Sequence, residues 1–445
     1  MSQSDLAVII LAAGKGTRMK SALHKVLHPL GGRPMLHHLM NTLDILQPVR
    51  KVIVVGAGKA QVEQSVGDQA EIVVQEPQLG TGHAVQVTRD QLADFSGDIL
   101  ILYGDVPLLS SDTLKKLLDK RHDEQNPAVV VLGFEPEDTR AYGRLVLDDQ
   151  GGLISIVEHK DATEDERAIG LCNSGIMAID GARMFELLDR LDNNNAAGEF
   201  YLTDIVAIAR SMDYECAVAV ASESEVIGIN SRSELAEAEA IFQTAKRQEF
   251  MDGGVTLLDP SSVYFSYDTE IAPDVTIEPN VFFGPGVVVE ENVTIRAFCH
   301  FEGATIRKNA TVGPYARLRP KADVGTGAKI GNFVEIKKSV IKDGAKVSHL
   351  SYIGDAIIGA GANIGAGTIT CNYDGFNKSL TEIGAGAFIG SNTALVAPVS
   401  IGEGAVVGAG SVVTRPVSAD ALVVSRVKQK EIDGWARAFR DKQKK

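Results

Sequence analysis

The sequence has few cysteines and no long apolar run. Its four cysteines, Cys172, Cys216, Cys299 and Cys371, lie far apart and form no C-x-x-C pair, so the pattern indicates neither a disulfide framework nor a zinc site. No stretch reaches the roughly 18 consecutive apolar residues of a membrane span. The first residues, MSQSDLAVIILAAG, contain neither the basic region nor the cleavage site of a signal peptide. We therefore expect a cytoplasmic protein with no membrane partner.

Basic residues are also in the minority. The 58 acidic residues exceed the 44 basic ones and give a formal net charge of -14, which argues against a nucleic-acid partner because phosphate contacts need a basic field. Any anionic ligand must therefore meet cations that are gathered locally. A helical bundle is disfavoured too, since 44 glycines and 15 prolines interrupt the chain. The length of 445 residues, 44% of them hydrophobic, predicts two domains with packed cores.

Residues 1–229 have the pattern of an α/β domain. Short apolar runs such as VIILAAG, VIVVGA, ILILYGD and AVVVLGF alternate with helical stretches. Strands that are buried on both faces read as continuous Val/Ile/Leu runs, and helices between them imply crossover connections and a parallel sheet. In such sheets ligands bind outside the carboxyl ends of the strands. We therefore expect the chemistry of this half to lie just after VIILAAG and just after ILILYGD.

The remainder predicts a linker helix at 230–250, a second domain at 251–425 and a basic tail at 426–445. The linker, SRSELAEAEAIFQTAKRQEF, opens with a serine cap and a Glu-rich first turn. Beyond it, 23 hexad positions run from 271 to 413, and only Phe283 and Phe301 among them are not Ile, Leu or Val. One inward aliphatic residue in six is typical of a parallel β-helix, here of about seven to eight triangular coils that rise about 4.8 Å each. The gap between Ile364 and Ile383 predicts an extruded loop.

A Gly-rich, cationic loop follows the first predicted strand. The stretch LAAGKGTRMKSALHK places Gly14, Gly16, Arg18 and Lys25 together. It fits neither the dinucleotide fingerprint nor the P-loop. Backbone N–H groups exposed by glycines can still cradle a triphosphate, with the cations neutralising its charge. An ordinary strand-to-helix turn with surface cations is the alternative interpretation.

A second Gly-rich turn and a carboxylate follow other strands. QLGTGHA spans 78–84, and LYGDVPLL places Asp105 directly after a buried strand. A carboxylate there suits Mg²⁺, which prefers a few protein oxygens and leaves room for substrate. A local turn acceptor is the alternative for Asp105.

The order of these motifs resembles a known family. The pieces are similar to nucleotide-sugar pyrophosphorylases. Residues 5–437 resemble the bacterial bifunctional N-acetylglucosamine-1-phosphate uridyltransferases/glucosamine-1-phosphate acetyltransferases. The order is LAAGKGTRM, QLGTGHA, YGDVPLL, YGRLV, VEHKDAT, NSGI and EFYLTDI, followed by hexapeptides, RLRP, GNFVEIKK, HLSYIGDA, NIGAGTITCNYDG and SRV. One departure is NSGI, at 173–176, where the family usually has Asn-Thr-Gly-Ile; this change preserves the hydroxyl and should matter little.

The resemblance implies a fold and two reactions. The fold is a Rossmann-like α/β nucleotidyltransferase domain followed by a left-handed parallel β-helix of hexapeptide repeats, assembled as a homotrimer. Acetyl-CoA would acetylate glucosamine 1-phosphate, and UTP would then react, with Mg²⁺, with N-acetylglucosamine 1-phosphate to release pyrophosphate. The product, UDP-N-acetylglucosamine, is a precursor of peptidoglycan and lipopolysaccharide.

The resemblance also implies the residues of the first site. Arg18 and Lys25 would act on the UTP phosphates, and Asp105 and Asn230 would be the metal ligands. The implied substrate-binding residues are Leu11, Ala12, Ala13 and Gly14 for the phosphates, Gln75, Gly80 and Thr81 for uracil, and Tyr103, Gly104, Gly143, Glu158, Asn173 and Asn230 on the sugar-phosphate side.

A second site is implied in the repeats. By itself, His349 would be expected to be a surface or corner residue, and Arg319 and Lys337 to be solvated cations. Coil stacking is expected to bring the cations near one another. By resemblance, His349 would be the general base that takes a proton from the sugar amine, and glucosamine 1-phosphate would be bound by Arg319, Lys337, Tyr352 and Asn363.

Acetyl-CoA would be bound by a further set of residues. By resemblance these are Ala366, Asn372, Tyr373, Ser391, Ala409 and Arg426. A Cys371 nucleophile is a competitor to direct transfer, but a thiolate needs a positioned base. The tail at 426–445 holds eight basic and three acidic residues. We expect Arg437 and Arg440 to lie near the anionic end of CoA with Trp435 packed against it, although a solvated end is the alternative.

Two other functions stay open at this point. The chain could be a monofunctional nucleotide-sugar pyrophosphorylase whose β-helix only assembles or regulates it. It could also be a non-enzymatic scaffold, as in translation initiation factor subunits that pair a similar domain with hexapeptide repeats. The intact set of Gly14, Arg18, Lys25 and Asp105 argues against the scaffold.

Overall fold

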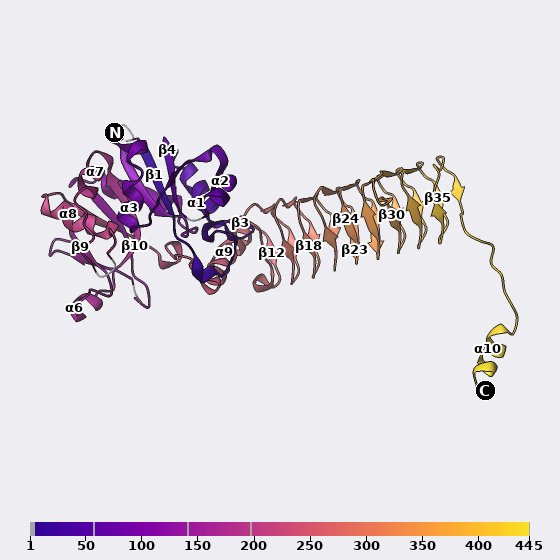
Figure 1. Ribbon diagram of the computed structural model, residues 1–445. Coiled ribbons are helices and arrows are strands. Elements are labelled where there is room, and N and C mark those ends of the chain that lie inside the picture. The colour runs from indigo at the N-terminus through magenta and orange to yellow at the C-terminus, as the bar shows by residue number, and fades with distance from the viewer. Residues whose placement is uncertain (1–4, 57, 140–141, 196–197, 445) are drawn as a thin grey trace. The chain divides into compact units, whose positions relative to one another are not determined.

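A computed structural model describes residues 5–56, 58–139, 142–195 and 198–444 (Figure 1). The chain divides into two compact units, residues 1–244 and 245–445. Within the described ranges, no helix combines the length and the apolar character that a bilayer crossing requires.

The first unit is built on a twisted sheet whose central strand is β1 (Leu6–Ala12), buried along its whole length. The path of the sheet is β11-β7-β10-β6-β1-β4-β5. The other strands of this path are β4 (Arg50–Val55), β5 (Glu71–Val74), β6 (Asp98–Tyr103), β7 (Val129–Phe134), β10 (Cys172–Asp180) and β11 (Cys216–Ala221).

The expected parallel pairing is found for β1 with β4 and β6, for β4 with β5 and for β7 with β11, but the sheet is mixed because β10 departs from it. β10 runs antiparallel to both of its neighbours, β6 and β7, and it also meets the hairpin of β8 (Arg144–Leu147) and β9 (Leu153–Val157). A buried apolar run such as GIMAI has the same composition in either direction. The run itself therefore does not encode the direction of β10.

Helices cover both faces of this sheet. Side chains of α1 (Met35–Asp44), α2 (Lys59–Val66) and α5 (Ser111–Arg121) share one apolar cluster with alternate residues of β1. Side chains of α3 (Thr81–Gln86), α7 (Gly181–Leu188) and α8 (Ile205–Ser211) share the cluster on the opposite face. Two single-turn helices, α4 (Arg89–Leu92) and α6 (Glu164–Arg167), and short 3-10 turns complete the unit.

Most of the segment 230–250, expected to be a linker helix, lies in the long helix α9 (Arg232–Asp252). Its first part belongs to the first unit, where Ala238 packs with Leu30 and Met35. Its last part belongs to the second unit, where the Phe250 ring lies 4.7 Å from that of Phe265. The helix therefore contributes to two separate cores.

The second unit is a parallel β-helix with three faces, named here in chain order. In the described part of the chain these faces contain ten, eight and eight strands. The first face consists of β12 (Thr256–Leu257), β14 (Thr276–Ile277), β17 (Thr294–Ile295), β20 (Thr311–Val312), β23 (Lys329–Asn332), β26 (Lys346–His349), β29 (Asn363–Ile364), β32 (Phe388–Ile389), β35 (Val406–Val407) and β37 (Leu422–Val423).

The other two faces are built in the same way. The second face consists of β15 (Phe282–Phe283), β18 (His300–Phe301), β21 (Arg317–Leu318), β24 (Glu335–Lys337), β27 (Tyr352–Gly354), β30 (Ile369–Cys371), β33 (Ala394–Val396) and β36 (Val412–Val413). The third face consists of β13 (Glu270–Ile271), β16 (Val288–Val289), β19 (Ala304–Ile306), β22 (Ala322–Val324), β25 (Ser339–Ile341), β28 (Ala356–Ile358), β31 (Thr381–Ile383) and β34 (Val399–Ile401).

The hexad residues form the apolar interior of this prism, as in the run Ile330, Ile336 and Ile341. The gap between Ile364 and Ile383 differs from expectation, because Thr370 fills another interior position and is fully buried. Its hydroxyl satisfies its hydrogen bonds internally, accepting from the Gly354 N–H at 2.8 Å and donating to the Gly354 carbonyl at 3.0 Å. The extruded loop is therefore shorter than expected and lies between β30 and β31. After these strands the chain ends in α10 (Trp435–Gln443).

Candidate active sites

The first candidate site is a cleft at the carboxyl ends of β1 and β6. Leu11 and Tyr103 are register partners there. From β1 the chain continues to β4 and β5 on one side and returns to β6 on the other, so this edge is the switch point of the sheet, where ligands of α/β proteins bind. The cavity measures about 380 Å³ and is lined by Leu11, Ala12, Ala13, Gly14, Lys25, Val26, Gln75, Gln78, Gly80, Thr81, Ala84, Tyr103, Asp105, Glu199 and Asn230.

Three segments distant in sequence meet at one end of this cleft. The Lys25 ammonium donates to a carboxylate oxygen of Asp105 and, at 2.5 Å, to the amide oxygen of Asn230. The Lys25 and Asp105 side chains are only 11% and 17% exposed. Arg18, expected in the same site, is exposed and does not line the cavity. Its charge reaches Glu234: burial acts to raise the pKa of that carboxyl, but hydrogen bonds and the charge of Arg18 outweigh burial and lower it. Glu234 in turn accepts the Asn230 backbone N–H at 2.7 Å.

The arrangement of oxygens fits a divalent cation. The two oxygens of Asp105 and Asn230 converge on a single positive charge, that of Lys25. Over the described ranges, no group of three or more His, Cys, Asp or Glu side chains forms a closed metal cage. A hard cation that takes few protein ligands and completes its shell with water and phosphate suits such a pair.

Two glycines shape the loop that leads to Lys25. Gly16 has φ +59, and a Cβ built on it would lie 2.6 Å from the Cβ of Lys25. A side chain at this position would therefore be strained and would displace Lys25. A Cβ on Gly14 would face open space, so the backbone there is accessible to a ligand.

The loop after β5 also lines the cavity. The side-chain amide of Gln75 donates through Nε2 to the Gly80 carbonyl at 2.8 Å, which fixes its orientation. The backbone N–H of Gln75 donates to the Val55 carbonyl at 2.8 Å. Thr81 accepts the Leu202 N–H at 3.0 Å through its hydroxyl. Gln78, which the sequence reasoning missed, donates to the Ala13 carbonyl and joins this loop to the strand β1.

A second lobe of about 390 Å³ adjoins the first and shares Thr81, Tyr103 and Glu199 with it. Its other lining residues are Glu158, His159, Lys160, Asp161, Asn173, Tyr201 and Thr203. Burial, followed by the charges of Asp161 and Asp204, raises the pKa of Glu158. Burial also raises the pKa of Tyr103, as do the nearby carboxylates Asp105 and Glu158. Tyr103 is therefore a neutral phenol between the two lobes.

The wall of the second lobe is formed by an irregularity in β10. The pairing of β10 with β7 shifts between Asn173 and Met177. The Ser174 hydroxyl donates to the Leu132 carbonyl at 2.6 Å. Ser174 stands where the family usually has threonine, and the hydroxyl that both residues share makes a hydrogen bond here. Asn173 accepts the Gly175 N–H at 2.9 Å.

Two expected glycines, Gly104 and Gly143, do not line either lobe. Gly104 lies behind the lining, with Val26 3.2 Å from the position of its Cβ. Gly143 approaches Glu158, whose Oε1 would lie 3.6 Å from a Cβ there, and its carbonyl accepts the Asn173 N–H at 2.9 Å.

The sequence reasoning assigned no role to several lining residues. Glu199, Tyr201 and Thr203 belong to EFYLTDI, and His159 to Asp161 belong to VEHKDAT. Apart from Glu158, which had an implied role on the sugar-phosphate side, the residues of these motifs were noted for their order alone. They lie on loops, where no periodicity reveals which side chains face a cleft.

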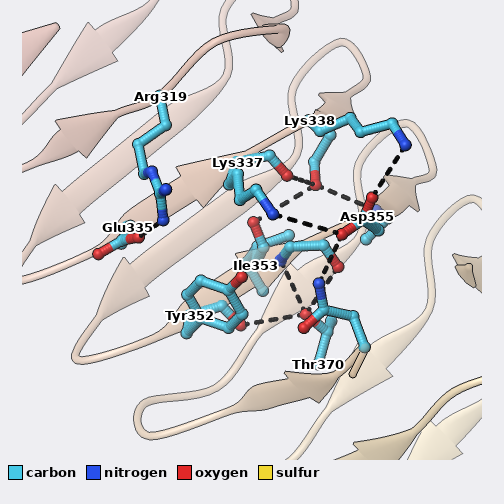
Figure 2. Close-up of polar contacts among 12 residues, drawn as sticks. Arg319, Glu335, Lys337, Lys338, Tyr352, Ile353, Asp355 and Thr370 are labelled. Atoms are coloured by element: carbon cyan, nitrogen blue, oxygen red, sulfur yellow. Dashed lines mark hydrogen bonds and ion pairs between the residues drawn. The ribbon is translucent and has the colours of Figure 1, made fainter. Parts of the chain in front are cut away.

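The second candidate site is a charged cluster on the second face and at its corner with the third face. Arg319 pairs with Glu335 at 2.9 Å, and Lys337 and Lys338 contact Asp355 at 3.9 and 3.2 Å. Figure 2 shows these side chains and their pairing. Burial acts to raise the pKa of Asp355, but the hydrogen bond from Asn372 and the charges of both lysines outweigh it and lower the pKa.

The extruded loop adds a cation that the sequence reasoning missed. Lys337 lowers the pKa of Lys378, through hydrogen bonding first and charge repulsion second. Asp355 and Tyr352 act on Lys378 in the opposite direction. A hydrogen bond of 2.5 Å from Asn372 to Asp355 holds the start of the loop. Arg319, Lys337 and Lys378 are thus three cations of this cluster, and Tyr352 acts electrostatically on both Arg319 and Lys378.

His349 ends β26 at the other edge of the second face. It is exposed, its Nδ1 lies 2.6 Å from Oδ1 of Asn332, and its carbonyl accepts the Gly367 N–H at 3.2 Å. The imidazole therefore does not point into the apolar interior. Only β27, with Tyr352 at its start, separates the corner of His349 from that of Asp355. Asn363 lies on the first face, paired with Lys346.

Turn residues on the following coils lie in a row that starts at His349, with one residue on each coil. The Ala366 carbonyl accepts from Asn392 at 2.7 Å, and the Ser391 carbonyl accepts from Gly410 at 2.8 Å. The Ala409 carbonyl then accepts from the Arg426 guanidinium at 2.6 Å. Four of the residues expected to contact acetyl-CoA thus follow His349 along one corner.

Asn372 and Tyr373, expected in the same set, lie elsewhere within this chain. Asn372 is buried against Asp355 at the corner between the second and third faces. Tyr373 is exposed and donates to the Gly375 carbonyl at 2.5 Å. Cys371 contacts the Ile369 carbonyl at 3.9 Å, which is not a base that would activate a thiol.

Three family models match the chain. The MobA-like NTP transferase domain matches residues 8–198, the GMPPB C-terminal domain matches residues 301–373, and the bacterial transferase hexapeptide (six repeats) matches residues 380–415. Together with the three parallel faces, the hexapeptide match identifies the second unit as a left-handed β-helix. The fold class expected from the sequence is confirmed.

Curated relatives are similar along the whole chain. A protein of Paramagnetospirillum magneticum is 57% identical over 443 residues, which is 100% of this chain and 98% of the relative. A protein of Zymomonas mobilis is 54% identical, over 100% and 99%, and one of Sphingopyxis alaskensis is 56% identical, over 99% and 98%. All three are named bifunctional protein GlmU. The similarity includes both candidate sites.

Proposed function

Because this chain belongs to the family of bifunctional GlmU proteins, we propose that its two units hold the two active sites of UDP-N-acetylglucosamine synthesis. The chain is an acyltransferase that acetylates glucosamine 1-phosphate and a nucleotidyltransferase that joins the product to UTP. The observation that carries the assignment of sites is that residues distant in sequence gather into two clusters, one in each unit. UDP-N-acetylglucosamine is a precursor of peptidoglycan and lipopolysaccharide, so the reactions belong to cell-wall synthesis in the cytoplasm.

In the second unit, His349 is the general base. A neutral imidazole carries a lone pair on one ring nitrogen, which can accept a proton. Nε2 takes a proton from the amine of glucosamine 1-phosphate as the amine nitrogen attacks the thioester carbonyl. The C–N bond forms, the C–S bond breaks, and the proton held by His349 leaves with the CoA thiolate. The exposure of His349 supports this role, because substrate can reach the ring.

The cations next to His349 bind the sugar phosphate. Arg319, Lys337 and Lys378 offer three positive charges in the cluster that contains Tyr352. Asp355 limits the repulsion between the lysines, since it pairs with Lys337 at 3.9 Å. A phosphate dianion would add a second counter-charge, so its binding is favoured. Asn363, on the first face, is the further contact that we propose for the sugar.

Acetyl-CoA binds along the row of turn residues that starts at His349. Coils rise about 4.8 Å each. The row of turns therefore forms an extended surface for the pantetheine arm, which runs from His349 through Ala366 and Ser391 to Ala409. Arg426 lies at the end of this row, against Ala409 at 2.6 Å, and suits a CoA phosphate. The remaining proposed contacts are Asn372 and Tyr373 from the extruded loop, which a neighbouring subunit would supply, and Arg437, Arg440 and Trp435 of the tail.

In the first unit, the phosphate end of the cleft binds UTP. Leu11, Ala12, Ala13 and Gly14 present their backbone to the triphosphate, Lys25 and Arg18 neutralise it, and Gln75, Gly80 and Thr81 read uracil. Tyr103, Gly104, Gly143, Glu158 and Asn173 form or support the sugar lobe. The sugar phosphate oxygen attacks the α-phosphorus in line and pyrophosphate leaves, so that positioning and charge neutralisation are the catalytic contributions.

Nucleotidyl transfer in this family requires a divalent metal, which we assign as Mg²⁺ held by Asp105 and Asn230. When bound, the metal neutralises charge that develops on the phosphate oxygens. Lys25 must then release both oxygens, and its ammonium becomes available to the leaving pyrophosphate.

We propose that the chain assembles as a homotrimer through its β-helix. At the corner between the first and second faces, successive coils place Phe298, Tyr315, Phe333 and Leu350 at φ between +51 and +61. These residues are 47 to 63% exposed, and the first three rings stack 4.8 and 5.1 Å apart. Bulky residues rarely adopt this conformation, so an exposed apolar ridge of them supports a contact with another copy. Substituting Leu350 by Asp should lower the mass measured by sedimentation, and an unchanged mass would contradict this assembly.

Two assays separate this function from the alternatives. Purified protein should release CoA thiol from acetyl-CoA and glucosamine 1-phosphate, and pyrophosphate from UTP and N-acetylglucosamine 1-phosphate. A metal chelator should abolish the second reaction and leave the first. Absence of CoA release would support a pyrophosphorylase with a structural β-helix, and absence of both would support a scaffold.

A further inference from the structure

The two strands that meet at His349 are unusually long for their face. β23 (Lys329–Asn332) and β26 (Lys346–His349) have four residues each, whereas every other described strand of the first face has two. The extra residues add one register pair, Asn332 with His349, beyond the interior pair of Ile330 with Val347. Among the described strands of the first face, the ladder is therefore extended only where it reaches His349.

A glycine allows this extension. A Cβ on Gly331 would lie 1.8 Å from the carbonyl oxygen of Ser348. No side chain fits there, so the backbones of the two coils come together more closely at Gly331 than any other residue would permit. The close approach brings the side chains of Asn332 and His349 to the same edge.

The hydrogen bond between them selects one tautomer of the neutral ring. Oδ1 of Asn332 lies 2.6 Å from Nδ1 of His349. An amide oxygen only accepts, so Nδ1 carries the proton and donates it. In the neutral ring the lone pair then lies on Nε2, the nitrogen directed away from Asn332.

We propose that Asn332 is a positioning residue for acetyl transfer, which holds His349 in the tautomer whose Nε2 is the base. This inference rests on the proposed role of His349. Asn332 does not touch the substrate but acts through the imidazole. Because an amide is neutral, it orients the ring without the rise in basicity that a carboxylate partner would cause.

The backbone of His349 is held independently of Asn332. Its carbonyl accepts the Ser351 hydroxyl at 2.8 Å and the Gly367 N–H at 3.2 Å. A substitution at Asn332 therefore changes the ring and leaves the turn in place. The charged groups on the flanking strands, whose field stays the same in such variants, are Lys329 and Lys346 on the first face and Glu335 and Lys337 on the second.

The test compares Asn332→Leu with Asn332→Asp in the full-length protein. Leu has a similar size but no acceptor, whereas Asp keeps an acceptor at the same place. Protein labelled with ¹⁵N on histidine would be examined by magic-angle-spinning NMR, with His349 identified by the loss of its signals in His349→Ala. His300, paired with Glu302 at 3.5 Å, is the internal reference in the same repeats.

The expected results differ between the two variants. In the wild type and in Asn332→Asp, His349 should carry its proton on Nδ1. In Asn332→Leu this preference should be lost, and kcat for acetyl transfer should fall about 10- to 100-fold with little change in KM for glucosamine 1-phosphate. In Asn332→Asp kcat should be largely rescued, and the acid limb of its pH profile should move to higher pH, because a carboxylate stabilises the imidazolium.

Other outcomes would overturn the inference. Asn332→Leu with the wild-type tautomer, or with unchanged kcat and a raised KM, would show that Asn332 does not position the ring. Uridylyl transfer by the same preparation checks that each variant is folded. If His349→Ala kept its CoA release, the proposed base itself would be wrong, which is a different result from failure of the Asn332 variants alone.

Discussion

Substituting Lys25 by Met should tighten the binding of a divalent cation to the protein without nucleotide. The Lys25 ammonium contacts Asp105 and lies 2.5 Å from the Asn230 oxygen, so it uses the two oxygens that we assign to the metal. A cation can bind there only if Lys25 withdraws. Met keeps the length of the side chain and removes its charge.

The magnitude follows from the burial of the pair. Two unit charges 4 Å apart interact by about 4 kcal/mol at an effective dielectric constant of about 20, and a divalent ion doubles this value. Water screens the site weakly, because Lys25 and Asp105 are 11% and 17% exposed. In the wild-type protein, Lys25 can move away when the cation binds, which relieves most of the repulsion between the ammonium and the cation. We therefore expect a gain of at least about 1.4 kcal/mol, which is tenfold in Kd.

The assay is the electron paramagnetic resonance signal of free Mn²⁺ during titration of the protein. Lys51→Met is the matched control, since Lys51 is also a partly buried lysine in an ion pair, 2.6 Å from Asp44. The control should bind Mn²⁺ as the wild type does. If Lys25→Met bound Mn²⁺ no more tightly than the wild type, Lys25 would not compete for these oxygens, and the assignment of Asp105 and Asn230 as the cation site would fail.

Three further predictions concern single positions. Gly16→Ala should reduce uridylyl transfer at least tenfold and spare acetyl transfer, because its Cβ would lie 2.6 Å from that of Lys25 at φ +59; equal rates in both assays would contradict this. Ser174→Ala should destabilise the first unit by about 1 kcal/mol in a urea titration, since the bond to the Leu132 carbonyl is lost, whereas Ser174→Thr should match the wild type. Asp355 has a lowered pKa in the folded state, so its contribution to stability is complete above the unfolded value of about 3.9 and is lost as the pH falls through the folded value; Asp355→Asn should flatten the acid side of the stability curve below about pH 4, and an unchanged curve would refute it.

The periodic parts of the fold are predictable from sequence because burial repeats with the backbone. Each coil of the prism must turn one side chain inward, and residues such as Ile330 and Ile336 report this directly. The aliphatic pattern did not predict the interior position of Thr370, because a hydroxyl can be buried when Gly354 supplies both of its hydrogen-bond partners. The direction of β10 escaped it too, because apolar composition does not depend on strand direction.

The sites are predictable only in part. Asp105 and the loop after β1 follow strands, and the carboxyl edge of an α/β sheet places such residues together. Lys378 and Glu199 lie on loops whose paths depend on particular hydrogen bonds, such as that of Asn372 with Asp355 at 2.5 Å. The resemblance supplied most of the remaining residues, and their roles stay predictions.

The central claim is that the two reactions use separate sites, and one pair of variants tests it most directly. His349→Ala and Asp105→Ala would each be assayed for release of CoA thiol and of pyrophosphate, with folding checked by circular dichroism. We predict that His349→Ala loses only CoA release and that Asp105→Ala loses only pyrophosphate release. Loss of both activities in either folded variant, or retained CoA release by His349→Ala, would contradict the account.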